Sequence, residues 1–254
     1  MCIISFHVDD HPKYKLIVAA NRDEFYERPT KEAGFWEDEP NLLAGQDLRA
    51  FGTWLGITKS GRFAALTNYR DLASERPDRK SRGDIVLDFL KSDIEPEAYL
   101  EKLRETRTEY NGYNTLVGSS VDEIYYYGNQ QEDIIKVAPG THTVSNHLLN
   151  TPWPKVENAR TMLHNYVKAN ETIDVEVLFE QLASVDKAPD EMLPDTGVGL
   201  ALERDLSPIF IRTDNYGTRA STVILVTHDN DVTFIERTFN SGSLKKENAF
   251  EFKI

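Results

Sequence analysis

The amino-acid sequence predicts an α+β fold in which mainly antiparallel sheets are covered by helices. Apolar segments of strand length, rich in β-branched residues, occur as neighbours joined by short polar turns, as in hairpins. Segments with helical spacing separate these groups, in the order strands, helices, strands, helices, strands. Strict βαβ alternation, which would indicate a parallel sheet, is missing. We therefore expect one layered domain over residues 1–254.

Two hairpins are expected in the first third of the chain, separated by loops. The first one ends in the polar group Asn21-Arg22-Asp23-Glu24. Because a hairpin brings the chain back alongside its start, this group should lie close to Cys2. The expected strands are 2–8, 14–20, 53–58 and 62–67, and the expected loops are 25–52 and 72–82.

The rest of the chain is expected to add two helical pairs and further strands. We expect a hairpin around the turn His228-Asp229-Asn230, because both flanking segments are rich in β-branched residues. The expected helices are 83–91, 96–106, 154–168 and 174–184. The expected strands are 114–119, 123–127, 134–137, 141–144, 209–212, 221–227, 232–237 and 248–254, and residues 185–207 are expected to be a long loop beside a binding site.

Composition excludes several classes of function. A net charge of −13 argues against a nucleic-acid surface, which needs clustered Lys and Arg. One cysteine cannot form an internal disulfide or a Cys-rich metal site, and the spacing of His142 and His147 is not a metal-site signature. No secretory signal and no apolar stretch of about 20 residues is present, so we expect no transmembrane segment and a cytoplasmic protein.

The only cysteine, Cys2, directly follows the initiator methionine. Removal of Met1 would give Cys2 a free α-amine with a reference pKa of about 7.7–8.0 beside a thiol of about 8.5. Such a residue is a nucleophile that carries its own base, as in N-terminal nucleophile hydrolases. The alternative is a small apolar residue buried in a strand, since free cysteine is often buried.

Several motifs together resemble the NRDE-domain family, the relatives of transport and Golgi organisation protein 2. They run in order from the first residue to beyond residue 225. The motifs are Met1-Cys2, Asn21-Arg22-Asp23-Glu24, Gly52-Thr53-Trp54-Leu55-Gly56, Leu66-Thr67-Asn68-Tyr69-Arg70, Ser81-Arg82-Gly83, Asn146 followed by Pro152-Trp153-Pro154-Lys155, and Tyr216-Gly217-Thr218-Arg219-Ala220-Ser221-Thr222.

This family is distantly similar to choloylglycine hydrolases and penicillin V acylases. The resemblance implies a four-layer αββα sandwich, with two antiparallel sheets between helices. It also implies a processed N-terminal cysteine that attacks an amide carbonyl with the help of Arg, Asp and Asn residues. Members of the NRDE family have been linked to haem trafficking and to lipid or acyl-CoA metabolism.

The resemblance gives roles to the residues around Cys2. Asp23 would hold the α-amine, and Arg22 would stabilise a thiolate or bind an acyl carboxylate. Adjacent residues on an extended strand point to opposite faces, so both reach Cys2 only if the strand breaks there. The related acylases space these residues as Arg-x-x-Asp, a pattern that this sequence lacks. The alternative is an exposed turn with a surface ion pair.

Asn68 and Asn146 each follow a strand-like segment and are candidate donors to an oxyanion, although asparagine is also a common turn residue. Arg219 resembles the late arginine that orients the nucleophile in the acylases, or is a cation at a sheet edge. Trp54 and Tyr69 are candidates for substrate contact, with core packing as the alternative for Trp54.

The first functional hypothesis is an amidohydrolase that acts on a linear C–N bond of an acyl-type small molecule through Cys2. The second is a non-enzymatic protein on the same fold that binds or carries haem or an acyl lipid. His7 is the histidine to test as a haem ligand, and no other cofactor and no metal is expected. The third is a scaffold or interaction protein. The sequence does not fix the substrate or the oligomeric state.

Overall fold

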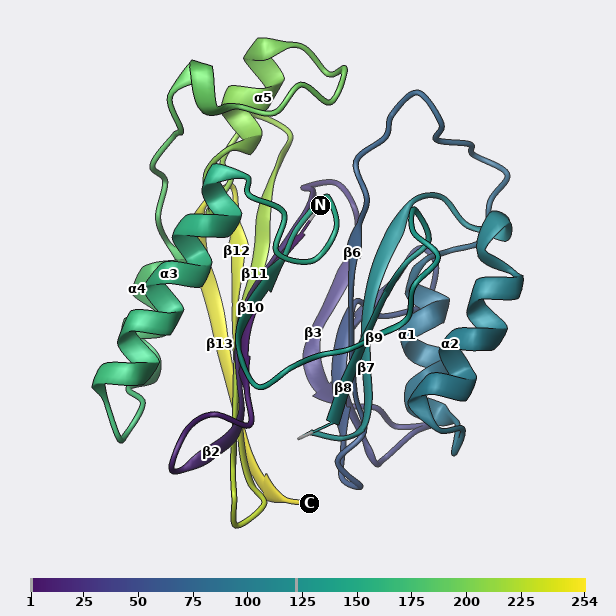
Figure 1. The fold of residues 1–254 in the computed structure, drawn as a ribbon, viewed down its shortest axis with the longest axis vertical. Coiled ribbons are helices and arrows are strands. Elements are labelled where there is room, and N and C mark those ends of the chain that lie inside the picture. The colour runs from purple at the N-terminus through teal and green to yellow at the C-terminus, as the bar shows by residue number, and fades with distance from the viewer. Residues whose placement is uncertain (1, 122) are drawn as a thin grey trace.

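A computed structural model describes residues 2–121 and 123–254. Two antiparallel sheets pack face to face, and helices cover both outer faces (Figure 1). The four-layer αββα arrangement and the α+β class are therefore confirmed. The removal of Met1, on which the Cys2 hypothesis depends, concerns a residue outside the described ranges.

The first sheet has six strands in the order β10-β1-β2-β11-β12-β13, and neighbouring strands are antiparallel. All seven residues of β1 are buried, because its two faces are covered by the second sheet and by helices. The strands are β1 (Cys2–Val8), β2 (Tyr14–Phe25), β10 (Gly140–Val144), β11 (Tyr216–Thr227), β12 (Asp231–Asn240) and β13 (Ser243–Lys253).

The second sheet has seven strands that follow one another in sequence order, from β3 to β9. Consecutive antiparallel strands need only short connections, except where a helical pair intervenes between β6 and β7. The strands are β3 (Thr30–Phe35), β4 (Leu42–Asp47), β5 (Leu55–Thr58), β6 (Phe63–Asn68), β7 (Tyr113–Ser120), β8 (Glu123–Gly128) and β9 (Ile135–Lys136).

Helices α1 (Gly83–Lys91) and α2 (Pro96–Glu105) cover the seven-stranded sheet, and α3 (Pro154–Ala169) and α4 (Val175–Leu182) cover the six-stranded sheet (Figure 1). A further short helix, α5, spans Leu200–Leu206. Two 3₁₀ turns lie at Arg107–Glu109 and Asp190–Met192.

Strand alternation divides the apolar side chains into layers. The even-numbered residues of β1, such as Ile4 and Phe6, face the second sheet and pack with Phe63 and other residues there. The odd-numbered Ile3 faces the opposite way and packs in the cluster that contains Leu163 of α3. The shared core between the sheets favours one domain over residues 1–254, which stays a prediction.

Two segments expected to be loops contain regular structure. Residues 25–52 hold β3 and β4, and residues 185–207 hold α5, so both loop predictions were wrong. The two strands contain glycine and charged residues and lack clear alternation, and α5 is only seven residues long. Pairing with the neighbouring strands, which the local sequence does not reveal, stabilises β3 and β4.

The expected strand 209–212 is not a strand, and β2 does not break at its polar group. The backbone N–H of Phe210 bonds to the Ser184 carbonyl, and that of Ile211 bonds to the Thr218 hydroxyl. Meanwhile β2 continues through residues 21–24 to Phe25, because β11 extends beside it as far as Tyr216.

No helix within the described ranges is long and apolar enough to cross a bilayer. Within the same ranges, no group of three or more His, Cys, Asp or Glu side chains is placed to hold a metal ion.

Candidate functional site

A cavity of about 340 Å³ opens where the polar ends of β1, β2 and β11 meet the second sheet. Six residues predicted from the sequence line it, and they come from five strands or connecting segments. They are Cys2, Arg22, Asp23, Trp54, Asn68 and Arg219. The sequence motifs thus converge on one site, at the strand ends and not along their length.

Cys2 is the first residue of β1 and pairs directly with Arg22 of β2. Its side chain is on the face of the sheet that meets the second sheet, and the residue is 7% exposed. Burial raises the pKa of the Cys2 thiol, and the negative charge of Asp23 adds to this rise, whereas Arg22 acts against it. The Ser145 hydroxyl donates to the Cys2 carbonyl over 2.8 Å and so fixes the strand end.

Arg22 and Asp23 lie on opposite faces of β2, because the strand stays extended. Arg22 shares the face of Cys2, between the sheets. Asp23 accepts a 2.7 Å hydrogen bond from the Thr218 hydroxyl on the other face, and burial raises the pKa of its carboxyl group. Both residues nevertheless border the cavity.

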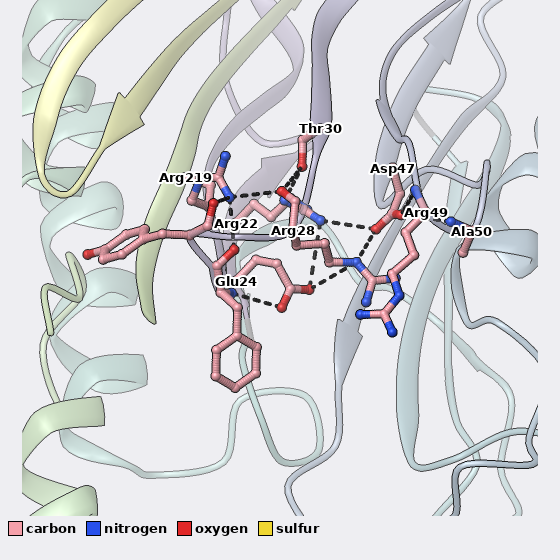
Figure 2. A network of polar contacts seen from close by, with 10 residues as sticks. Arg22, Glu24, Arg28, Thr30, Asp47, Arg49, Ala50 and Arg219 are labelled. Atoms are coloured by element: carbon pink, nitrogen blue, oxygen red, sulfur yellow. Dashed lines mark hydrogen bonds and ion pairs between the residues drawn. The ribbon is translucent and has the colours of Figure 1, made fainter. Parts of the chain in front are cut away.

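The guanidinium group of Arg22 reaches across the cavity to the second sheet (Figure 2). It contacts Asp47 at the end of β4, and Arg28 holds the same carboxylate oxygen over 2.5 Å. Burial would raise the pKa of Asp47, but the hydrogen bonds from Arg28 and from the backbone of Ala50 and Arg49 lower it. This ion-pair network keeps Asp47 charged and joins the two walls.

Arg219 is the extra residue of a β-bulge in β11. Thr218 pairs with Asp23 and Ala220 pairs with Arg22, so Arg219 has no counterpart on β2. Its Nη1 donates to the carbonyls of three residues that form the turn after β2 (Figure 2): Phe25, Tyr26 and Arg28. The bulge thus turns a cation into the cavity and uses it to hold the turn.

The two asparagines predicted as oxyanion donors have different surroundings. Asn68 lines the cavity, and its side-chain amide makes no hydrogen bond within the described ranges. Asn146 is fully buried and does not line the cavity. Its Nδ2 donates to the Asn68 carbonyl over 3.1 Å. Asn146 therefore holds the backbone that presents Asn68.

The two candidates for substrate contact also separate. Trp54 lines the cavity and belongs to the core between the sheets, so both of its predicted environments apply. Tyr69 does not line the cavity and instead packs its ring on His147, at a centroid distance of 4.9 Å. His7 lies away from the cavity, where its Nδ1 bonds to the Thr141 hydroxyl.

A buried polar cluster lies on the outer side of the six-stranded sheet, and we define it as Arg70, Asn146, Lys155 and Glu203. Arg70 and Glu203 form a 2.7 Å ion pair with side chains only 3% and 4% exposed. Lys155 donates to the Asn146 side-chain oxygen and to the Leu206 carbonyl, each over 3.2 Å. Arg70 also contacts the Asn146 oxygen, at 3.4 Å.

Lys155 is the first residue of a buried stripe on α3 that continues with Ala159, Leu163 and Val167. Burial and the nearby charge of Arg70 lower the pKa of Lys155 to about 7. A neutral amine has two N–H donors, and both are used, by Asn146 and by Leu206. Both of these hydrogen bonds go to groups of the protein itself.

The sequence argument gave no role at the site to three charged residues that lie at or beside it: Arg82, Lys155 and Glu236. Arg82 and Lys155 did occur in the family motifs. Glu236 lines the cavity on β12, accepts a 2.6 Å hydrogen bond from Ala33, and has a pKa that burial raises to about 7. For Glu236 and Lys155, the sequence signal that could have revealed burial is their position in the apolar periodicity of their strand and helix. Glu236 continues the buried alternation of Val232 and Phe234, and Lys155 begins a buried helical stripe.

Comparison with protein families places the whole fold and these motifs in one group. The family described as Transport and Golgi organisation 2 matches residues 1–241. The chain is 38% identical to the Transport and Golgi organization 2 homolog of Mus musculus, over 100% of this chain and 99% of that protein. It is 31% identical to Transport and Golgi organization protein 2 of Drosophila melanogaster, over 94% of this chain and 92% of that protein.

Solved structures share the fold at low sequence identity. The C2A mutant of a conjugated bile acid hydrolase from Clostridium perfringens matches with a TM-score of 0.55 and 8% identity, over 99% of this chain and 92% of that chain. An orthologue of N-acylethanolamine-hydrolyzing acid amidase from Caenorhabditis elegans matches with a TM-score of 0.51 and 11% identity, over 88% and 92%. The fold is thus that of the N-terminal nucleophile hydrolases.

Proposed function

The chain belongs to the Transport and Golgi organisation 2 family, and from the geometry of its cavity we propose that it is an N-terminal-cysteine amidohydrolase. The substrate would be an acyl-type small molecule with a linear amide bond. One observation carries this proposal: the only cysteine of the chain lies at the start of β1, on a cavity that Arg22, Asp23 and Asn68 also line. Two proteins of similar fold are named as hydrolases of conjugated bile acids and of N-acylethanolamines.

The first half of the reaction needs the α-amine that removal of Met1 would free. The amine takes the thiol proton, and the sulfur attacks the amide carbonyl carbon. Asp23 holds the resulting ammonium group by charge, and the Asn68 amide donates to the oxyanion of the tetrahedral intermediate. The C–N bond then breaks, the ammonium gives its proton to the leaving amine, and a thioester on Cys2 remains.

The second half returns the enzyme to its starting state. The free α-amine takes a proton from water as the water oxygen attacks the thioester carbonyl. The C–S bond breaks, the proton returns to the sulfur, and a carboxylic acid leaves. Arg22 faces the cavity beside Cys2 and favours the thiolate, in opposition to the burial that raises the thiol pKa.

The test is the intact mass of the purified protein before and after incubation with p-nitrophenyl octanoate. We expect a mass without the initiator methionine and a single octanoyl adduct that disappears with time. Cys2→Ala should form no adduct and release no p-nitrophenol above the rate in buffer, while its melting temperature stays close to that of the natural chain. Turnover by Cys2→Ala equal to that of the natural chain would refute the proposal.

A second candidate is a non-enzymatic protein that binds haem or an acyl lipid in the same cavity. The observation in its favour is the buried Cys2, whose raised pKa keeps the thiol in its less reactive protonated form near neutral pH. Titration with haem and with octanoyl-CoA would then give a saturable spectral or thermal shift, without release of product. Retention of Met1 in the intact mass would also favour this candidate. A cytoplasmic location stays a prediction, to be checked by fractionation of cells.

A further inference from the structure

Positive charge is concentrated in the cavity. Among the described residues that line it are eight Lys or Arg and five Asp or Glu. The whole chain has the opposite balance, with 29 Lys or Arg and 42 Asp or Glu. Two of the five acidic residues, Glu24 and Asp47, are already paired with Arg22 and Arg28. The rest of the cavity therefore has an excess of cationic groups, which favours an anionic ligand.

Among these cations, Arg82 combines burial with weak charge compensation. Its side chain is 20% exposed, and its carboxylate partner, Glu75, lies 3.5 Å away on the exposed loop. Nη1 also donates to the Gly112 carbonyl over 3.0 Å. Nε and Nη2 make no hydrogen bond within the described part of the chain, so the guanidinium group keeps donors for a ligand.

Close backbone packing fixes Arg82 in the cavity wall. Arg82 immediately precedes Gly83, the first residue of α1, and Gly83 lies against Gly52. A Cβ atom on Gly52 would lie 2.6 Å from the Gly83 carbonyl carbon, which no side chain tolerates. The backbone N–H of Thr53 donates to the Gly83 carbonyl over 3.3 Å. The backbone that carries Arg82 thus has a rigid support, as a binding residue requires.

Arg82 directly precedes α1, on the side of the seven-stranded sheet, whereas Cys2 belongs to the six-stranded sheet, and both line the cavity. Burial lowers the pKa of the Arg82 guanidinium group, and the Glu75 and Glu24 carboxylates act against this. An amide placed at Cys2 would therefore have a cationic group across the cavity from it. Carboxylate and phosphate groups are the ligands that the planar guanidinium fork binds best.

We propose that Arg82 binds a carboxylate or phosphate group of the substrate, so that the cavity selects anionic acyl amides. This inference rests on the proposed amidohydrolase, because it places the anion relative to an amide at Cys2. Binding does not require the chemical step, so the two proposals can fail separately.

The experiment uses the full chain with Cys2→Ala, which cannot consume the ligand, and three probes with the same acyl chain. N-octanoylglycine carries a carboxylate, N-octanoyl-O-phosphoethanolamine a phosphate, and N-octanoylethanolamine no charge. Calorimetry should show at least one anionic probe binding about tenfold or more tighter than the neutral probe. The better anionic probe identifies which of the two groups the site prefers.

The second substitution removes the charge under study. Adding Arg82→Gln should abolish most of the preference for the anionic probes, and Arg82→Lys should retain part of it. Arg76→Gln is the matched control, because Arg76 is on the same loop, is exposed, and does not line the cavity. It should leave all three affinities unchanged.

The Cys2→Ala chain with Arg82 intact provides a measurement that does not depend on how Arg82→Gln folds. Its preference for the anionic probes should decrease as NaCl is raised, whereas binding of the neutral probe should not. Equal affinity for charged and neutral probes, failure of both anionic probes to bind, or a preference that survives in a folded Arg82→Gln chain would each overturn the inference. A failed acylation of Cys2 with the preference intact would overturn only the proposed hydrolase.

Discussion

Two groups of polar side chains, one in the cavity and the other in the buried polar cluster, differ in the groups that complete their hydrogen bonds. In the cavity, Arg82 and Asn68 retain hydrogen-bond donors that no group in residues 2–121 and 123–254 uses. In the buried polar cluster, Arg70 donates to Glu203, and Lys155 donates to Asn146 and to the Leu206 carbonyl. A charged residue near an active centre can thus serve either the ligand or the fold. The difference lies in which groups complete its hydrogen bonds.

The largest expected effect is a difference in the free energy of unfolding between loss of a buried cation and loss of an exposed one. Arg70→Met should lower the free energy of unfolding by about 3–5 kcal/mol, because it leaves the Glu203 carboxylate buried without its cation. Urea denaturation measures this change. Lys187→Met is the control. Lys187 forms an exposed 2.7 Å ion pair with Asp205, which lies on α5 as Glu203 does. This substitution should cost less than about 1 kcal/mol. Equal losses would show that burial does not distinguish the two pairs.

The next effect separates the two asparagines. Asn68→Ala should slow acylation of Cys2 by p-nitrophenyl octanoate about 10²–10³-fold with little change in stability, because an oxyanion donor is lost. Asn146→Ala should lower the melting temperature, because it leaves donors of Lys155 and Arg70 buried without an acceptor. Stopped-flow kinetics and thermal unfolding measure the two. The reverse pattern would assign the direct role to Asn146.

The smallest expected effect is a pH dependence of stability. Lys155 has a pKa of about 7 in the folded chain and an ordinary value of 10.5, so between these values the unfolded chain binds more protons. Stability should therefore rise with pH in this window, by about 2 kcal/mol from pH 7 to 9. Denaturation curves of Lys155→Met should lack this rise.

Glu236, which lines the cavity, should give a pH dependence of stability with the opposite sign. Its pKa is raised from 4.5 to about 7, so the folded chain binds more protons in that window and stability should fall as pH increases. Glu236→Gln should be flat between pH 4.5 and 7 and should keep the rise above pH 7. Parallel curves for the natural chain and either variant would mean that the corresponding group titrates normally.

Much of the fold could be predicted because its strands carry their own signals. The hairpins around residues 9–13 and 228–230 were both correctly predicted. In each of them, two apolar or alternating segments flank a polar turn. β4 could not be predicted in this way, because its sequence Leu-Leu-Ala-Gly-Gln-Asp becomes a strand by pairing with β3 and β5. Such pairing depends on the two neighbouring strands and not on the residues of β4 alone.

The candidate site shows the same limit at the level of side chains. The motifs placed Cys2 and Asn68 on the cavity, where the start of β1 in one sheet meets the end of β6 in the facing sheet. They also placed Asn146 there, although its side chain turns toward the buried cluster. Whether a polar group faces a cavity or a closed cluster depends on residues from distant parts of the chain. Local sequence does not contain that information.

The contact between Gly52 and Gly83 has a consequence for protein engineering. Because this contact anchors residues 79–83, which line the cavity, the exposed residues 72–78 just before them can change in length without moving the backbone of Gly83. A fluorescent label or a peptide tag inserted there would be held next to the segment that lines the cavity. The fold thus offers a ready attachment point for a sensor that reports when the cavity fills.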